Sequence, residues 1–325
     1  MALKGDVVKE YCRKYRNTSS KELGVLLYKE QPLLFKDAEN ARGCVRYYRG
    51  AFGVRNRRKV SELIEKITLP ESDAVSTAPY EISDFPVAIC GDMHLPYHDV
   101  NAVRAFLDHA GEVGARTIVL CGDMLDAYQL SKWCKDPRKR SFPEEISMMK
   151  EFLQSIHNVF PDSRIVYKVG NHEERYENYV KIKAPELFGL DEVRLPNLLG
   201  IDKDASPWID WVDDKRVLVA KKLHIIHGHE YVFSISNPVN PARGLYMRSK
   251  KSTMCFHFHQ SSEHTETDID GDIETCWSVG CLCGLTPEYM PMNKWCHGFA
   301  DITLSDDIQD GWKVRNFRLF KGNVL

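Results

Sequence analysis

The chain has 325 residues with 44 Lys and Arg against 46 Asp and Glu, so its formal net charge is −2. Hydrophobic residues make up 43% and charged residues 28%, which excludes disordered, collagen-like and low-complexity proteins. No apolar stretch approaches the roughly 20 residues that span a bilayer, and the polar, basic start lacks the apolar core of a secretory signal. We therefore expect a folded cytoplasmic protein without membrane association.

Ten cysteines are scattered along the chain, and no two of them form a C-x-x-C pair. This spacing argues against a structural zinc site. In a chain of this size without a signal sequence, we expect reduced, mostly buried thiols in a reducing cytosol.

The near-neutral total conceals an uneven distribution of charge. Residues 1–69 hold 16 Lys and Arg against 8 Asp and Glu, a net charge of +8, which leaves −10 for the remainder. Such asymmetry predicts two modules with different partners. Residues 70–86 are rich in Pro, Ser, Ala and acidic residues, so we predict a linker there, between a basic helical domain (1–69) and a larger domain (87–325).

The basic domain is predicted to be a small all-α, helix-turn-helix-like unit of three short helices. Ser19 and Glu22 form a capping-box pattern ahead of an apolar run, and a third helix is expected over Asn40 to Tyr48. One face of that helix and the segment after it are basic, and we expect nucleic-acid contact there. The alternative is a solvated basic helix that docks on the acidic domain. The candidate contacts are Arg42, Arg46, Arg49, Arg55, Arg57 and Arg58.

Beyond the linker, short apolar runs alternate with amphipathic, helix-length segments. VAIC (87–90), TIVLC (117–121) and RIVYKV (164–169) are predicted strands, with helices expected near 100–113 and 144–159. This order predicts an α/β sheet, and from about residue 208 the sequence becomes strand-rich.

Metal-binding residue types follow these strands directly. In open α/β sheets, ligands bind at the carboxyl ends of the strands, where the loops converge. One such residue is ordinary turn chemistry, but five strand ends in succession predict a metal site. The residues are Asp92 and His94, Asp123 and Asp126, Asn171 and His172, His227, and His257 and His259.

The series D-x-H, G-D-x-x-D, G-N-H-E, H and H-x-H resembles the calcineurin-like metallophosphoesterase superfamily. The resemblance implies a four-layer α/β/β/α sandwich, with two mixed β-sheets flanked by helices. The Cys-, Met-, Pro- and aromatic-rich stretch 280–299 resembles a segment of phage- and prophage-encoded members and is a candidate cover for the site.

The resemblance also implies a ligand set for two divalent ions. Mn²⁺ is the first expectation, with Fe or Zn²⁺ as alternatives, because carboxylate, amide and imidazole suit these ions and no thiolate competes. The two ions would clamp a phosphoryl group and supply a bridging hydroxide as nucleophile. Asp92, His94 and His259 would bind one ion, Asn171, His227 and His257 the other, and Asp123 both.

His172 would protonate the leaving oxygen, with Asp126 holding its ring in the working tautomer. Arg175 and His98 are candidate substrate contacts. The sequence departs from the family pattern at Phe256, where Gly usually precedes the final H-x-H. It departs again at Ala127-Tyr128, where protein phosphatases carry Arg-Gly.

We therefore expect a metal-dependent phosphodiesterase or nuclease acting on nucleic acid or nucleotides. The alternatives are a phosphomonoesterase, protein phosphatases included, and a nucleic-acid-binding protein whose phosphoesterase scaffold is inactive. The complete ligand set favours activity, and Ala127-Tyr128 disfavours a protein phosphatase.

Overall fold

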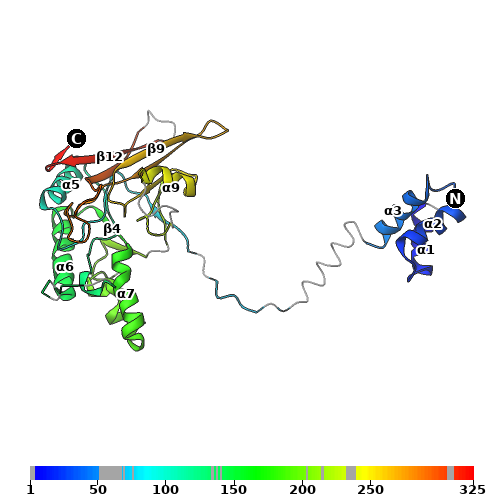
Figure 1. The fold of residues 1–325 in the computed structure, drawn as a ribbon, viewed down its shortest axis with the longest axis horizontal. Coiled ribbons are helices and arrows are strands. Elements are labelled where there is room, and N and C mark those ends of the chain that lie inside the picture. The colour runs from blue at the N-terminus through cyan, green and yellow to red at the C-terminus, as the bar shows by residue number, and fades with distance from the viewer. Residues whose placement is uncertain are drawn as a thin grey trace. The chain divides into compact units, whose positions relative to one another are not determined.

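The computed structural model describes residues 4–50, 68, 70–74, 77–132, 135–136, 138–139, 141–202, 204–213, 216–231, 239–305 and 311–325. The chain divides into two compact units, residues 1–75 and 76–325 (Figure 1). Among the described residues, no helix is long and apolar enough to cross a membrane.

Residues 4–50 of the first unit form three short helices, α1 (Lys4–Lys14), α2 (Ser20–Glu30) and α3 (Ala38–Tyr48). The predicted capping box is present at α2, because Ser19 Oγ accepts from the Glu22 amide at 3.2 Å and Glu22 Oε2 accepts from the Ser19 amide at 3.1 Å. The core of the unit consists of Val8, Leu23, Leu27, Phe35, Ala41 and Val45.

The second unit contains two mixed β-sheets. The strands below are given in their spatial order. The seven-stranded sheet is β13 (Asn323–Val324), β12 (Trp312–Phe320), β11 (His297–Leu304), β2 (Val87–Cys90), β3 (Thr117–Cys121), β4 (Arg164–Lys168) and β5 (Ile209–Val212). The six-stranded sheet is β1 (Tyr80–Ile82), β6 (Leu218–Ala220), β7 (Leu223–Ile225), β8 (Thr253–Cys255), β10 (Ile273–Ser278) and β9 (Ser262–Thr267).

Alternating side chains of the strands fill two hydrophobic layers. In β2, Val87 and Ile89 pack between the sheets, whereas Ala88 and Cys90 face α5 (Val100–Glu112) and α6 (Phe142–Val159). Residues of α9 (Pro241–Ser249) form a further cluster with β8 and β10. The resulting order is helix, sheet, sheet, helix, which confirms the predicted sandwich. The remaining helices are α7 (Asn171–Lys183), α8 (Leu195–Leu198) and the 3₁₀ turns Tyr128–Leu130, Pro185–Leu187 and Asp191–Val193.

The predicted linker is wrong at its C-terminal end. Tyr80–Ile82 forms strand β1, which pairs in parallel with β6 over Leu218–Ala220. Three residues are too few to show a strand period, and the partner strand lies far away in the sequence. The predicted strands at 87, 117 and 164 and the helices near 100–113 and 144–159 are present as β2, β3, β4, α5 and α6.

Strand order brings the candidate loops together. β2, β3 and β4 are parallel neighbours in one sheet, so their carboxyl ends meet at one edge. β7 and β8 are parallel neighbours in the other sheet. The loops after these five strands carry every predicted metal ligand.

Candidate metal centre

The loops after β2 and β3 run side by side. The amide of Asp92 donates to the Gly122 carbonyl at 3.0 Å, and the amide of His94 donates to the Asp123 carbonyl at 2.9 Å. These two hydrogen bonds extend the pairing of the strands beyond their ends. They fix the two carboxylates beside each other in the buried interior of the unit, where both are at most 1% exposed.

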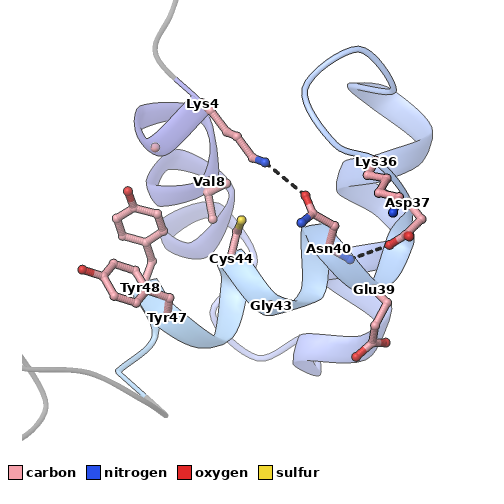
Figure 2. Close-up of a pocket in the computed structure, with 11 residues that line it drawn as sticks. Lys4, Val8, Lys36, Asp37, Glu39, Asn40, Gly43, Cys44, Tyr47 and Tyr48 are labelled. Carbon is pink, nitrogen blue, oxygen red and sulfur yellow. Dashed lines mark hydrogen bonds between the residues drawn. The ribbon is translucent and has the colours of Figure 1, made fainter.

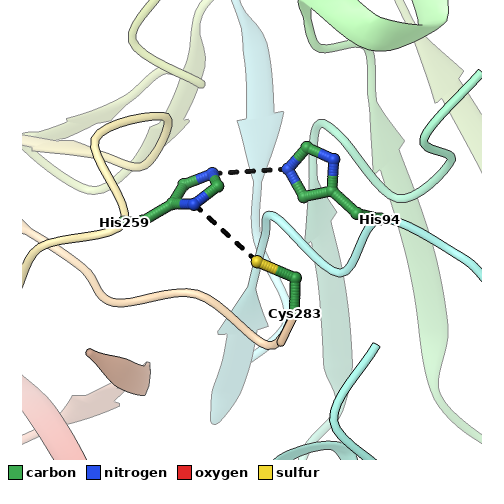
Figure 3. Close-up of side chains that lie close together, drawn as sticks. All are labelled: His94, His259 and Cys283. Carbon is green, nitrogen blue, oxygen red and sulfur yellow. Dashed lines mark hydrogen bonds between the residues drawn. The ribbon is translucent and has the colours of Figure 1, made fainter. Parts of the chain in front are cut away.

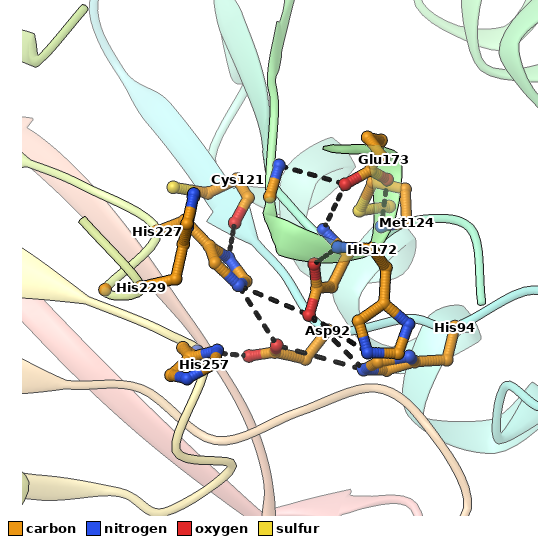
Figure 4. A network of polar contacts seen from close by, with 12 residues as sticks. Asp92, His94, Cys121, Met124, His172, Glu173, His227, His229 and His257 are labelled. Atoms are coloured by element: carbon orange, nitrogen blue, oxygen red, sulfur yellow. Dashed lines mark hydrogen bonds and ion pairs between the residues drawn. The ribbon is translucent and has the colours of Figure 1, made fainter. Parts of the chain in front are cut away.

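The first predicted ligand group is assembled around Asp92. His259 Nε2 lies 3.2 Å from Asp92 Oδ1. His94 Nε2 lies 4.0 Å from the same oxygen (Figure 4). The two Nε2 atoms are 3.3 Å apart, and His94 Nε2 lies 3.9 Å from Asp123 Oδ2. Three imidazole or carboxylate groups thus converge on one point, next to the expected bridging carboxylate.

The second group is assembled around Asp123. His227 Nε2 lies 3.3 Å from Asp123 Oδ2, and ligand atoms of His227, His257 and Asp123 lie within 4.8 Å of one another. Asn171 begins α7, and its neighbour His172 donates its amide to Asp123 Oδ1 at 2.8 Å. The loops after four strands therefore contribute to this group.

Within the part of the chain that the structure describes, three expected ligand atoms are buried without a hydrogen bond, although two of them face an oppositely charged group in an ion pair. They are Asp92 Oδ1, Asn171 Oδ1 and His227 Nε2. A buried polar atom without a partner costs free energy, and such atoms in native proteins call for an explanation. Divalent cations bound at these atoms would satisfy all three, so the residues fit a metal.

The backbone is left-handed at five of the seven predicted ligands. The φ angles lie between 50° and 69° at Asp92, His94, Asp123, His257 and His259. Non-glycine residues adopt this region at a cost of about 1–3 kcal/mol each, and such residues cluster at functional sites. Asp and His are among the side chains that tolerate it best. The fold therefore holds these ligands in position by its own packing.

Two glycines permit the close approach of the ligand loops. Gly122 has a φ of 81°, and a Cβ there would collide with the ring of His227. A Cβ at Gly170 would collide with the Asp123 side chain. Phe256, which departs from the family pattern, is fully buried against Gly91 and leaves His257 and His259 at the site.

The charges of the site are strongly coupled. Burial raises the pKa of Asp92, but the imidazoles of His259 and His227 outweigh it and hold the pKa below its usual range. Burial likewise opposes ionisation of Asp123, whose pKa is held well below its usual range by His172 and His227. Both carboxylates are therefore negative at neutral pH, as metal ligands must be.

The histidines respond to these carboxylates. Burial lowers the pKa of His227, but Asp123 and Asp92 raise it to about 10. Asp92 similarly raises the pKa of His259 well above its ordinary value against the effect of burial. His257 is different, since burial and the charge of His227 lower its pKa to about 4. Without metal, protons on His227 and His259 thus balance the carboxylates, and cations would replace those protons.

Hydrogen bonds select the histidine nitrogens that face the site. The Nδ1–H of His227 donates to the Cys121 carbonyl at 2.9 Å, which leaves Nε2 for a metal. His94 Nδ1 lies 3.0 Å from Asp126 Oδ1, which likewise leaves Nε2 of His94 to face the site.

The predicted role of the Asp126 carboxylate at His172 needs correction. His172 Nδ1 donates to the backbone carbonyl of Asp126 at 2.8 Å, while the carboxylate lies 3.5 Å away. The sequence could not distinguish the carbonyl from the carboxylate.

Arg175, a candidate substrate contact, lies beside His172. Its guanidinium donates to His172 Nε2 at 2.7 Å and to the Asp126 carbonyl at 2.8 Å. His172 Nε2 also lies 3.7 Å from Asp123 Oδ2, so this nitrogen faces the expected metals. The other substrate candidate, His98, pairs through its backbone with Cys283.

The sequence analysis missed the role of Glu173. This side chain is 1% exposed, and its two oxygens accept five hydrogen bonds from groups around the site. The signal was the fourth letter of G-N-H-E, which no ligand assignment used. The donors are the amides of Asp123, Met124, Leu125 and Gly170 and the hydroxyl of Tyr167, at distances of 2.9 to 3.1 Å (Figure 4).

A buried ion pair supports the loop that carries His227. Lys168 is fully buried, and its Nζ lies 2.9 Å from Glu230 Oε1. Glu230 also accepts from the amides of His227 at 3.2 Å and Gly228 at 2.6 Å. His229 lies 3.5 Å from Glu230 and is a neighbour of the site.

A thiol lies closer to the site than expected. Cys283 Sγ lies 3.7 Å from His259 Nδ1, and ligand atoms of His94, His259 and Cys283 lie within 4.8 Å of one another (Figure 3). Cys283 contacts the nitrogen of His259 opposite to the one that faces Asp92. Its contact therefore orients this imidazole.

The basic residues of α3 are arranged differently from the expected nucleic-acid contact. The guanidinium of Arg49 donates to the carbonyls of Thr18 and Tyr15 and so joins the α1–α2 connection to α3, while its contact with nucleic acid stays a prediction. Arg42 pairs with Glu39 at 3.0 Å, and Arg46 is half-buried. Arg55, Arg57 and Arg58 lie outside the described residues.

A groove opens between α1 and α3 instead (Figure 2). Lys4 Nζ donates to Asn40 Oδ1 at 3.1 Å across it, and Tyr47 is 61% exposed. Gly43 lies in the groove, and a Cβ there would meet no atom within 4 Å. The lining residues are Lys4, Gly5, Val8, Lys36, Asp37, Glu39, Asn40, Gly43, Cys44, Tyr47 and Tyr48.

The sequence model of the calcineurin-like phosphoesterase family matches residues 85–268, which is more than half of the chain. The chain belongs to this family. The calcineurin-like phosphoesterase domain is metal-dependent and indicates a hydrolase that acts on phosphate esters. No curated protein matches the sequence significantly.

Solved structures with related folds have low sequence identity to this calcineurin-like chain. Vacuolar protein sorting 29 from Cryptosporidium parvum is 15% identical, with a TM-score of 0.39 over 74% of this chain and 95% of the other. Yfce, a phosphoesterase from E. coli, is 11% identical, with a TM-score of 0.31 over 69% and 90%. A dimetal phosphatase from Danio rerio is 9% identical, with a TM-score of 0.36 over 68% and 93%.

Proposed function

We propose that the chain is a dinuclear metal-dependent phosphodiesterase or nuclease that acts on nucleic acid or nucleotides. The observation that carries this proposal is the convergence of two carboxylates and four imidazoles at the ends of five strands, with three orphaned ligand atoms among the site residues. We propose Mn²⁺ as the ion, with Fe or Zn²⁺ as alternatives, because carboxylate, amide and imidazole ligands accommodate all three.

One ion would be held by Asp92, His94 and His259, and the other by Asn171, His227 and His257. Asp123 would contact both, because its Oδ2 faces His94 at 3.9 Å and His227 at 3.3 Å. When bound, the ions would polarise a phosphoryl oxygen and acidify a water molecule.

His172 is the proposed general acid. The Asp126 carbonyl holds its Nδ1–H, so Nε2 is the atom that can carry a proton toward the leaving oxygen. In this structure, the Arg175 guanidinium donates to Nε2 at 2.7 Å. This hydrogen bond must break before Nε2 can contact the leaving oxygen of a substrate. A phosphate anion would attract its guanidinium away from the imidazole, which frees the Nε2 lone pair to take up a proton from solvent and then give it to the leaving oxygen. Arg175 thereby couples phosphate binding to exposure of the acid.

The N-terminal unit is proposed to bind the nucleic acid. Residues 4–50 hold 11 Lys and Arg against 6 Asp and Glu, and phosphate backbones attract such a surface without sequence readout. The groove between α1 and α3 offers Lys4 and Lys36 at its lining together with the exposed ring of Tyr47. Aromatic rings combined with lysines are typical of single-strand binding.

A substrate panel with Mn²⁺ tests the proposal. It should contain mono- and diesters, nucleotides, and single- and double-stranded DNA and RNA, and metal analysis should find about two ions per chain. His172→Ala should slow hydrolysis of a dinucleotide, whose leaving alkoxide needs a proton, by about 10²–10⁴-fold, and should slow that of bis-p-nitrophenyl phosphate, whose p-nitrophenolate leaves without one, much less. Hydrolysis of monoesters alone would overturn the diesterase assignment in favour of a phosphomonoesterase. Loss of every activity in the metal-loaded protein would favour an inactive scaffold.

The role of the N-terminal unit has its own test. Removal of residues 1–69 should spare hydrolysis of bis-p-nitrophenyl phosphate and reduce that of DNA or RNA. In the full chain, Lys36→Glu in the groove should weaken binding of oligonucleotides more than Lys29→Glu, the same charge change at an exposed position on α2. Equal effects of the two substitutions would contradict binding in the groove.

A further inference from the structure

Four aromatic side chains lie within a few residues of the site loops or against a site ligand. Tyr97 is three residues after His94, and its amide donates to the His94 carbonyl at 2.6 Å. Tyr128 is two residues after Asp126. Trp295 packs edge-on against His259, with ring centroids 4.0 Å apart, and Tyr289 packs on Trp295 at 6.2 Å. We call Tyr97, Tyr128, Tyr289 and Trp295 the aromatic rim.

An ion pair joins the two halves of the rim. The rings of Tyr97 and Tyr128 meet edge-on at 6.3 Å, and Lys139 Nζ lies 5.7 Å and 4.9 Å from their respective centroids. The same ammonium lies 2.6 Å from Glu288 Oε2, next to Tyr289 in the chain. The segment of Tyr97 is also tied to the opposite half by the Gly284 amide, which donates to the Tyr97 carbonyl at 2.9 Å. The rim is therefore held together.

The rings remain accessible although protein surrounds them. Tyr97 is 38% and Tyr289 70% exposed. Tyr289 packs on Trp295, whose ring contacts that of the predicted ligand His259, so this exposed ring lies one side chain away from the site. Nothing in the phosphoryl chemistry requires aromatic rings at that place.

We propose that the aromatic rim binds a nucleobase next to the scissile phosphate, so that the substrate is single-stranded or unpaired nucleic acid. The proposal rests on the proposed function. Each base has a π-face that stacks on aromatic side chains irrespective of sequence. A base inside a duplex has both faces covered, so it reaches the rim only after leaving the stack.

The test compares two diesters with the same p-nitrophenolate leaving group. One is thymidine 5′-(p-nitrophenyl phosphate) and the other is methyl p-nitrophenyl phosphate, and the ratio of their kcat/KM values measures the contribution of the nucleoside. We expect Tyr289→Ala and Tyr97→Ala each to lower this ratio about tenfold, mainly through KM, as loss of one stacking contact predicts. Tyr289→Phe, which keeps the ring, should keep the ratio. Tyr179→Ala, at an exposed ring on α7, is the matched control.

A second readout needs no turnover. The dissociation constants of thymidine 5′-monophosphate and deoxyribose 5-phosphate, which lacks the base, are compared by calorimetry. We expect the wild type to prefer the nucleotide about tenfold and Tyr289→Ala to lose this preference. If the ratios of the rim variants lie within twofold of those of the Tyr179→Ala control in both assays, the rim does not bind the nucleobase. That result would leave the proposed diester hydrolysis intact. If neither diester is hydrolysed, the proposed function fails, and the binding ratio still decides the rim.

Discussion

Glu173→Gln should destabilise the second unit by about 3 kcal/mol. Glutamine keeps one carbonyl oxygen, which can retain the three hydrogen bonds that Oε1 accepts. Its amide nitrogen then takes the place of Oε2, which in the wild type accepts hydrogen bonds from the amides of Asp123 and Gly170, both at 2.9 Å. A nitrogen that is itself a donor cannot accept either bond. A hydrogen bond to a charged group contributes about 1.5–3 kcal/mol, so two lost bonds cost about 3–6 kcal/mol before relaxation.

Tryptophan fluorescence during urea unfolding measures this change. All six tryptophans lie after residue 75, so the signal reports the second unit alone. The measurement is made with a chelator present, which separates stability from metal binding. Glu174→Gln, at the adjacent position, removes a charge that lies 3.5 Å from His229 and should change the free energy of unfolding by less than about 0.5 kcal/mol. If Glu173→Gln costs less than about 1 kcal/mol, the five hydrogen bonds do not hold the loops.

Three further predictions concern ionisation and helix stability. Burial and the charge of Asp126 raise the pKa of Glu145 to about 8. Between pH 4.5 and 8, the folded state therefore holds a proton that the unfolded state has lost, and the free energy of unfolding falls as pH rises. Glu145→Gln should remove this pH dependence, which reaches about 1.4 kcal/mol per pH unit, when the free energy of urea unfolding is measured at pH 5 and pH 8. The same change in the free energy of unfolding in both proteins would contradict the prediction. Gly43→Ala should stabilise α3 by about 0.8–1 kcal/mol, because the position is exposed and has room for a methyl group. The exchange of the amide hydrogens of α3 should slow several-fold. Faster exchange would show that the glycine is needed there. Metal binding at pH 7 should release about two protons, from His227 and His259. Calorimetry in buffers of different ionisation enthalpy detects this release. A heat of binding that is independent of the buffer would show that the two imidazoles are not protonated before metal binds.

The sequence predicted those parts of the molecule that repeat a local pattern. The strands of the central sheet are continuous apolar runs, and the residues directly after them are site residues by position alone, so Asp92, Asp123 and His227 could be identified without a structure. Asp92 and Asp123 converge because β2 and β3 are parallel neighbours, an order that a helical crossover between two strands permits. The fold class and the predicted metal ligands could both be derived from this alternation of strands and helices.

Features set by contacts between distant segments could not be predicted. β1 has three residues and acquires its strand geometry from a partner far along the chain. Arg49 has the spacing of an exposed helical face, yet carbonyls of an earlier turn bind its guanidinium. The motif G-N-H-E places Glu173 beside the site, but nothing in the sequence indicates that four amides converge on its carboxylate. In each case, the deciding partner lies in a segment that periodicity does not connect.

The left-handed backbone at five ligands has a consequence for how ions are exchanged. Because packing already bends these loops, an arriving ion finds its ligands in place and need not reorganise the chain. Loss of an ion would likewise leave the scaffold intact, with protons taking its place on the imidazoles. We would then expect the protein to be stripped and reloaded with a different metal without refolding, and the ion it carries in a cell to follow the local supply of metals.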